Sequence, residues 1–205
     1  YVYYSMFGFQ RIGDLAWAAG DMQARGFLLG GTSGRTTLNG EGLQHEDGHS
    51  HILANTIPNC VSYDPTFAHE VAVIMHDGLK RMVERQENVF YYITLLNENY
   101  AMPGLLPGTE EQIIKGMYLC KPGADGDKRV QLLGSGTILR ESLEAQTLLA
   151  ADWGVQADVW SCPSFNELTR EGQDADRWNL LHPLETPRVP FVTRQLGSRS
   201  GPVVA

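Results

Sequence analysis

The sequence predicts an α/β fold with a mainly parallel sheet, because strand-length apolar segments alternate with longer segments of helical periodicity. The chain has 205 residues, 42% of them hydrophobic, which is enough for one large or two small cores. The pattern weakens between residues 97 and 128, where Pro103, Pro107, Pro122 and several glycines lie. We therefore expect two α/β parts joined by a linker.

The first part is expected to open with a strand at residues 1–4 and a helix over residues 6–25. Gly26 favours the end of that helix, and a short buried strand follows at residues 27–29. The apolar stripe that predicts the buried face of the helix consists of Leu15, Ala18, Ala19 and Met22.

A long polar loop is expected over residues 30–51, and loops of that length in compact domains are usually functional or disordered. Residues 60–63 then predict a strand, and residues 67–83 a helix with apolar residues at helical spacing. A strand at residues 89–96, rich in aromatic and β-branched residues, closes the first part.

The second part repeats the strand–helix alternation. One helix, over residues 110–119, interrupts the linker. Beyond it we expect strands at 129–133, 155–161 and 203–204 and helices at 138–152 and 166–181.

The segment Leu133-Gly134-Ser135-Gly136-Thr137-Ile138-Leu139 follows a strand and opens a helix, as a dinucleotide-binding fingerprint does. Leu139 stands where the third glycine of that fingerprint belongs, and no acidic residue is placed to bind a ribose. The segment therefore predicts a tight turn between strand and helix.

Composition argues against several classes of partner. The net charge is −8, the pI is near 5.2, and no run of Lys or Arg occurs, so neither nucleic acid nor an anionic membrane is expected as a partner. No apolar stretch is long enough to span a bilayer.

Cys60, Cys120 and Cys162 are odd in number and far apart, which favours buried thiols in a cytoplasmic protein. The chain has no initiator Met and strand-like ends, so we expect it to be a segment of a longer protein.

The loop at residues 40–51 concentrates the polar chemistry, with three imidazoles and three carboxylates among glycines. One interpretation is a solvated polar loop, and a second is a metal site built from His45, His49, His51 and Asp47. Its spacing matches no zinc signature. A third is a catalytic or substrate-binding loop, because imidazole passes protons near neutral pH and neighbouring carboxylates tune it. Composition alone leaves all three open.

An aromatic segment at the start of the first helix is a second candidate. Tyr4, Phe7 and Phe9 precede Arg11, so ring faces, a phenol and a guanidinium lie close together in the sequence. Such a set could hold a flat heteroaromatic ligand and an anion. The alternative is that Phe7 and Phe9 are core residues.

Three long runs, residues 4–14, 30–51 and 174–188, closely resemble the homodimeric, bacterial-type pyruvate dehydrogenase E1 component family. The resemblance extends over the whole chain. It implies that residues 1–97 are the second half of a parallel-sheet, transketolase-like pyrimidine-binding domain and that residues 98–128 are a linker. Residues 129–205 would then begin a transketolase C-terminal-like α/β domain.

The same resemblance implies site residues. Phe7 would stack on the aminopyrimidine ring of thiamine diphosphate, with Tyr4 near that ring and the substrate, and Arg11 would be a supporting cation. His45 would hydrogen-bond the bound pyruvate adduct, with Glu41 close by; His49 and His51 receive no catalytic role. The Mg²⁺ that accompanies the cofactor would be bound by a domain absent from this chain, which itself supplies no metal ligand.

The resemblance implies oxidative decarboxylation of pyruvate and reductive acetylation of the lipoyl group of the E2 dihydrolipoyl acetyltransferase, by a dimer with a second E1 protomer. The isolated chain is expected to be inactive, because the family's activating glutamate and its Gly-Asp-Gly metal motif lie outside it. The alternatives are a non-catalytic fragment or scaffold, or another thiamine diphosphate enzyme such as a transketolase.

Overall fold

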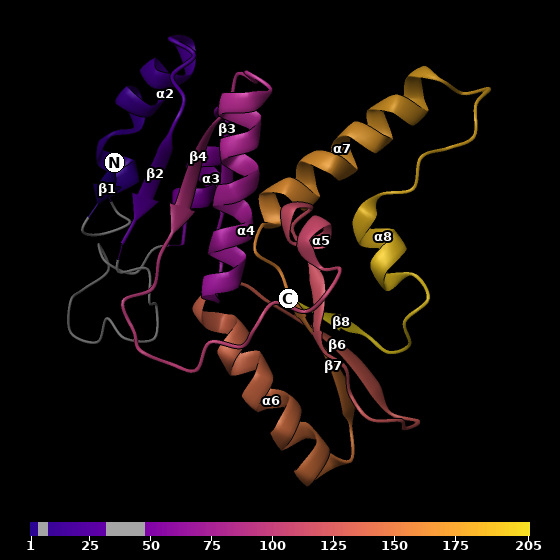
Figure 1. Cartoon of the computed structure of the whole chain (residues 1–205). Helices are drawn as coiled ribbons and strands as arrows, with labels where there is room; N and C mark the ends of the chain where they lie inside the picture. Colours follow the sequence, from indigo (N-terminus) through magenta and orange to yellow (C-terminus); the bar gives the residue numbers. More distant parts are fainter. Residues whose placement is uncertain (4–7, 32–47) are drawn as a thin grey trace.

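The chain folds around two four-stranded sheets in a computed structural model that describes residues 1–3, 8–31 and 48–205 (Figure 1). All strand pairs of the first sheet are parallel, in the order β1-β2-β4-β3. These strands are β1 (Val2–Tyr3), β2 (Phe27–Gly30), β3 (Cys60–Tyr63) and β4 (Phe90–Thr94). The prediction of a parallel α/β sheet is confirmed.

The register of the first sheet brings the ends of three strands into one row. Tyr3 pairs with Gly30, and Gly30 pairs with Thr94. These are the last residues of β1, β2 and β4, and β3 ends at Tyr63, which pairs with the residue before Thr94. The segments that follow the strands therefore leave the sheet at one edge, where parallel α/β sheets commonly bind ligands.

Both faces of the first sheet are buried, as expected for a parallel sheet. Val61, Tyr63 and Tyr91 pack on one face with Ile74 of α4, whereas Phe90 and Tyr92 pack on the other with α1, α2 and α3. The helices of this part are α1 (Gly8–Arg11), α2 (Gly13–Asp21), α3 (Ser50–Asn55), α4 (Ala68–Leu79) and the π-helical turn η2 (Lys80–Glu84).

The second sheet has the order β5-β7-β6-β8, and only its outer strand β5 is antiparallel. Val159 packs against Leu139 of α6 on one face, and Trp160 packs with Leu168 of α7 and Phe191 of α8 on the other. The elements are α5 (Glu110–Ile114), β5 (Tyr118–Lys121), β6 (Arg129–Gly134), α6 (Thr137–Trp153), β7 (Gln156–Ser161), α7 (Phe165–Leu181), α8 (Phe191–Leu196) and β8 (Val203–Val204).

Two predicted helices are wrong in extent. Instead of one helix over residues 6–25, the described residues form α1 and α2, and α2 ends at Asp21 shortly before Gln23 adopts a left-handed φ of 55°. The helix predicted over residues 110–119 ends early because Gly116 has φ +101°, and a Cβ there would lie 2.4 Å from the Ser164 carbonyl oxygen. The chain turns at this glycine into strand β5.

The apolar stripe predicted for the first helix is also wrong. Leu15 and Met22 are 69% and 74% exposed, whereas Ala16 is buried. Ala16 belongs to a different helical face, shared with Phe9 and Ile12, and this face packs against the sheet. The predicted stripe assumed one continuous helix over residues 6–25, whereas α1 and α2 are separate helices that pack against the sheet through Phe9, Ile12 and Ala16.

Three short elements were not predicted: α3, β5 and α8. Each is six residues or shorter, so neither helical nor strand periodicity had room to develop. Strand β5 lies inside the predicted linker and forms one of the two outer strands of the second sheet. No helix among residues 1–3, 8–31 and 48–205 is long and apolar enough to cross a membrane.

Asp158 of β7 is a buried carboxylate at the centre of a polar network in the second sheet. Its oxygens accept hydrogen bonds from the Gly123 amide at 2.9 Å, the Arg129 guanidinium at 2.8 Å and the Gln131 side chain at 3.1 Å. Gln131 in turn accepts from the indole of Trp160 at 2.9 Å. Burial alone would raise the pKa of Asp158, but these hydrogen bonds and the Arg129 charge outweigh burial and hold the pKa below its ordinary value.

Replacing Asp158 with asparagine is expected to cost about 1.5–3 kcal/mol near neutral pH, because a charged acceptor is lost while the shape is kept. A depressed carboxyl pKa contributes stability above the pKa of the unfolded chain and loses it as the pH falls through the folded pKa. The difference in thermal unfolding midpoint between wild type and Asp158→Asn should therefore be constant above about pH 5 and shrink below about pH 4. A difference that does not change with pH would contradict this account.

Candidate functional site

The two sheets meet at a polar seam where the chain leaves β3. The Asp64 amide donates to the Pro163 carbonyl at 2.7 Å, and the Gly136 amide donates to the Asp64 carbonyl at 2.9 Å. The backbone of Asp64, a residue of the first part, is therefore hydrogen-bonded both to the turn after β6 and to the turn after β7. Next to it, the Ser164 hydroxyl donates to the Ser62 carbonyl at 2.7 Å. The carboxyl ends of β3, β6 and β7 thus converge.

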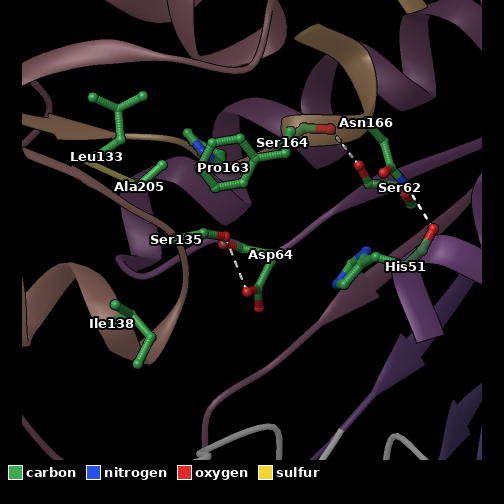
Figure 2. Close-up of a pocket in the computed structure, with 11 residues that line it drawn as sticks. His51, Ser62, Asp64, Leu133, Ser135, Ile138, Pro163, Ser164, Asn166 and Ala205 are labelled. Carbon is green, nitrogen blue, oxygen red and sulfur yellow. Dashed lines mark hydrogen bonds between the residues drawn. The ribbon is translucent and has the colours of Figure 1, made fainter. Parts of the chain in front are cut away.

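A cavity of about 310 Å³ lies at this seam (Figure 2). Its wall combines apolar groups, among them Leu133 and Ile138, with hydroxyl, carboxylate, imidazole and amide groups. The polar lining residues are His51, Ser62, Asp64, Ser135, Ser164 and Asn166. A mainly apolar cavity with a few converging polar groups at the carboxyl ends of strands is the usual form of a small-molecule site.

Asp64, Thr94 and His51 form a chain of hydrogen bonds along one side of the cavity. The Thr94 hydroxyl donates to Asp64 Oδ1 at 2.5 Å and lies 3.2 Å from His51 Nε2. The other carboxylate oxygen of Asp64 accepts from the Ser135 hydroxyl at 3.0 Å. Figure 2 shows this last bond, and also the bond from the Asn166 amide to the His51 carbonyl, which measures 2.7 Å.

The glycine-containing segment at residues 133–139 forms the turn between β6 and the first turn of α6. Gly136 has φ +50°, and a Cβ there would lie 2.6 Å from both carboxylate oxygens of Asp64. The Asp64 carboxylate therefore already occupies the helix N-terminus, where a phosphate would bind. The prediction of a tight turn is confirmed.

Glu70 is a second buried carboxylate of the seam, fully enclosed at the start of α4. One oxygen accepts from the backbone amides of Thr66 at 2.6 Å and Phe67 at 2.9 Å. The other accepts from the hydroxyls of Tyr118 at 2.8 Å and Ser161 at 2.5 Å, which belong to the second sheet. Burial and then the Glu70 charge raise the pKa of the Tyr118 phenol far above its ordinary value, so the phenol remains a donor.

The cysteines are free thiols, with Cys60 and Cys162 buried and Cys120 partly buried. Burial raises the pKa of Cys60 to about 12 and that of Cys120 to about 11, so neither is a reactive thiolate near neutral pH. Within the described ranges, no group of three or more His, Cys, Asp or Glu residues could hold a metal ion.

Of the predicted site residues, the structure describes only Arg11, an exposed residue at the end of α1. Tyr4, Phe7, Glu41 and His45 lie outside the described residues. Phe9, the other aromatic of that segment, is a core residue, in agreement with the core alternative for it.

The sequence did not single out Asp64, Thr94, Ser135 and Asn166 as lining or supporting residues, and His51 received no catalytic role. A signal was present, since Asp64 directly follows β3 of the first sheet and Ser135 directly follows β6 of the second. Polar residues just after parallel strands collect at the carboxyl edge of a sheet. Their meeting across two sheets could not be read from spacing.

Comparison with known structures defines the class of fold. A transketolase variant from Pichia stipitis superposes with a TM-score of 0.64 over 84% of this chain and 24% of its own, at 14% identity. Transketolase from Leishmania mexicana superposes with a TM-score of 0.61 over 81% of this chain and 23% of its own, at 13% identity. At these identities the likeness shows the fold alone: a transketolase-like arrangement of two α/β parts.

Sequence comparison defines the family. Residues 1–103 match the pyruvate dehydrogenase E1 component middle domain, and residues 116–205 match the transketolase-like C-terminal domain. The pyruvate dehydrogenase E1 component of Escherichia coli is 66% identical over 206 residues, and that of Cupriavidus necator 63% over 207. The chain therefore belongs to the pyruvate dehydrogenase E1 component family. The matches cover all of this chain but only 23% of either relative.

Proposed function

We propose that this chain is a segment of a thiamine diphosphate-dependent pyruvate dehydrogenase E1 component. The full-length protein would decarboxylate pyruvate oxidatively and pass the acetyl group to the lipoyl group of an E2 dihydrolipoyl acetyltransferase. The observation that carries this proposal is identity of 59–66% to proteins named for that component over the full length of the chain. The likeness to transketolases, at 13–16% identity, gives that alternative no comparable support.

The register of the first sheet supports the proposed site. Tyr3 and Gly30, the last residues of β1 and β2, are paired, and Thr94 at the end of β4 pairs with Gly30. The segment carrying Tyr4 and Phe7 follows Tyr3 in the sequence, and the segment carrying Glu41 and His45 follows Gly30. Both segments start at adjacent strand ends, which suits residues that act on one ligand.

These residue types fit an organic cofactor that combines a flat ring with an anion. When bound, thiamine diphosphate supplies the electron sink that decarboxylation of a 2-oxo acid requires. In our proposal the Phe7 ring stacks on the pyrimidine, and Tyr4 and His45 donate hydrogen bonds to the substrate oxygen that gains negative charge. Arg11 adds a positive charge at the site, and Glu41 tunes the adjacent hydrogen bonds.

Magnesium and the partners are proposed on the family alone. Mg²⁺ would be bound by the part of the protein that this chain does not span, and a second E1 protomer and the E2 lipoyl domain would be its protein partners. The division at residues 97 and 129 stays a prediction.

A direct test uses the full-length protein with thiamine diphosphate and Mg²⁺. We expect pyruvate-dependent reduction of an artificial electron acceptor, acetylation of a lipoyl domain, and no turnover by the 205-residue chain alone. Omission of thiamine diphosphate is the control and should abolish the signal. A full-length protein that is folded and loaded with cofactor but does not turn over pyruvate would refute the proposal, and turnover of a sugar phosphate instead would favour the transketolase alternative.

A further inference from the structure

A histidine at the wall of the seam cavity is connected by hydrogen bonds, through a threonine, to a buried carboxylate. Thr94 is fully buried and Asp64 is 6% exposed, so both lie out of water. Thr94 Oγ1 contacts Asp64 Oδ1 at 2.5 Å and His51 Nε2 at 3.2 Å. These three residues come from the end of β4, the residue after β3 and the start of α3.

The direction of each bond follows from the number of protons available. A threonine hydroxyl has one proton to donate, and an ionised carboxylate can only accept. Two acceptors lie near this hydroxyl, Asp64 Oδ1 at 2.5 Å and the Tyr63 carbonyl at 3.3 Å, and either way the proton points away from His51. The much shorter bond, to Asp64, takes the Thr94 proton, so the Thr94 oxygen accepts from His51. The proton must then reside on His51 Nε2, which makes Nδ1 the proton-accepting atom of the neutral ring.

Other contacts hold the two ends of this chain in place. The Ser135 hydroxyl donates to the second oxygen of Asp64 at 3.0 Å, and the Asn166 side chain donates to the His51 carbonyl at 2.7 Å. The His51 ring also lies 5.2 Å from the ring of Tyr92, at a tilt of 47°. Both the backbone and the imidazole of His51 are thus held at the cavity wall, and Figure 2 shows the Asn166 bond that holds the backbone.

We propose that Asp64 and Thr94 are positioning residues for the reaction, which hold the His51 imidazole at the cavity with its proton on Nε2. This inference rests on the proposed function and adds a role for His51, which the sequence resemblance left without one. A carboxylate that fixes a histidine tautomer through a hydroxyl keeps the ring in one orientation during turnover.

The kinetic test uses the full-length protein. Thr94→Val keeps the shape but removes the hydroxyl, and should lower kcat about 10- to 100-fold with a smaller change in the KM for pyruvate. Thr94→Ser, which restores the hydroxyl, should recover most of kcat. His51→Ala should have an effect similar to that of Thr94→Val, and the double variant should be little worse than either, because both remove one coupled unit.

Thr66→Val is the matched control, since Thr66 is also buried and donates across the seam, to the Gly136 carbonyl at 2.6 Å, but has no bond to His51. The effects of Thr66→Val and His51→Ala on kcat, expressed as free energies, should add in the double variant. Additive effects of Thr94→Val and His51→Ala, or a wild-type kcat in Thr94→Val, would overturn the proposal.

The tautomer itself can be measured independently of activity. Neutron diffraction from crystals of the full-length protein should show a deuteron on His51 Nε2 and the Thr94 deuteron directed at Asp64. A bare Nε2, with the Thr94 deuteron directed at His51, would overturn the positioning role even if pyruvate is turned over. Conversely, a protein with the expected deuterons but no activity toward pyruvate would refute the proposed function and leave the geometry established.

Discussion

Replacing Glu70 with alanine is expected to weaken the seam between the two sheets by about 3–5 kcal/mol, the largest stability effect that we predict. Four donors now share its two oxygens: two backbone amides at the start of α4 and the hydroxyls of Tyr118 and Ser161. All four lie around a side chain that is fully buried, so alanine leaves them without an acceptor in a space closed to water.

Glu70→Gln should lower the free energy of unfolding clearly less than Glu70→Ala. A glutamine oxygen can accept from the two backbone amides, and its NH₂ group can donate to the two hydroxyls, which rotate to accept. The order wild type, Glu70→Gln, Glu70→Ala in thermal unfolding midpoint therefore tests the hydrogen-bond arrangement as well as burial.

Hydrogen exchange of the full-length protein gives the local measurement. Glu70→Ala should increase exchange in peptides covering α4 and β5, the elements that Glu70 joins, with little change in α6. Glu111→Ala is the control, because Glu111 forms a surface ion pair with Lys115 and should leave the pattern unchanged. Equal effects of the two variants would show that Glu70 does not join the sheets.

The strands and long helices could be predicted because their signals are local and repeated. Strands β3, β4, β6 and β7 and helices α4, α6 and α7 lie close to their predicted positions. The helices carry apolar residues at three- to four-residue spacing over 12 to 17 residues, and the strands are short segments with apolar and β-branched residues between loop segments. Helix α2 shows the limit: over its nine residues the predicted apolar stripe is wrong, because the buried residue is Ala16 whereas Leu15 is exposed.

The seam could not be predicted, because its residues are joined across long distances in the sequence. Asp64 bonds to Ser135, 71 residues away, and Glu70 bonds to Ser161, 91 residues away. Each of these residues alone reads as an ordinary turn or helix-start residue. Their common role follows only from the contact between the two sheets, where hydrogen bonds of Ser62 and Asp64 join the end of β3 to the turns after β6 and β7.

Resemblance and geometry therefore contribute different parts of the site. The resemblance names Tyr4, Phe7, Arg11, Glu41 and His45, and the geometry adds a cavity and a tautomer-fixing chain through Asp64 and Thr94. The strand ends Tyr3, Gly30 and Thr94 connect the two sets, because they lie in one row of the first sheet. If the proposed function is right, substitutions at the residues named by the resemblance and at Asp64 and Thr94 should all lower pyruvate turnover. Substitutions at exposed residues far from these strand ends should not.

Replacing His45 with alanine in the full-length protein is expected to lower kcat for pyruvate about 10²- to 10³-fold, the largest effect on activity that we predict. As proposed, the imidazole donates to the substrate oxygen that becomes negatively charged, so its loss removes an interaction stronger in the transition state than in the bound substrate. Such a loss lowers kcat and kcat/KM together. His45→Gln should keep part of kcat, because its amide can still donate a hydrogen bond.

His76→Ala is the matched control for His45→Ala, since His76 is an exposed histidine of α4 that does not line the cavity. Its kcat should stay within a few-fold of wild type, and both variants should keep the wild-type unfolding midpoint. A wild-type kcat in His45→Ala would remove His45 from the mechanism. A raised KM with unchanged kcat would instead show that His45 binds substrate and transition state equally. Whether the substitution changes kcat or KM therefore decides the role of this histidine.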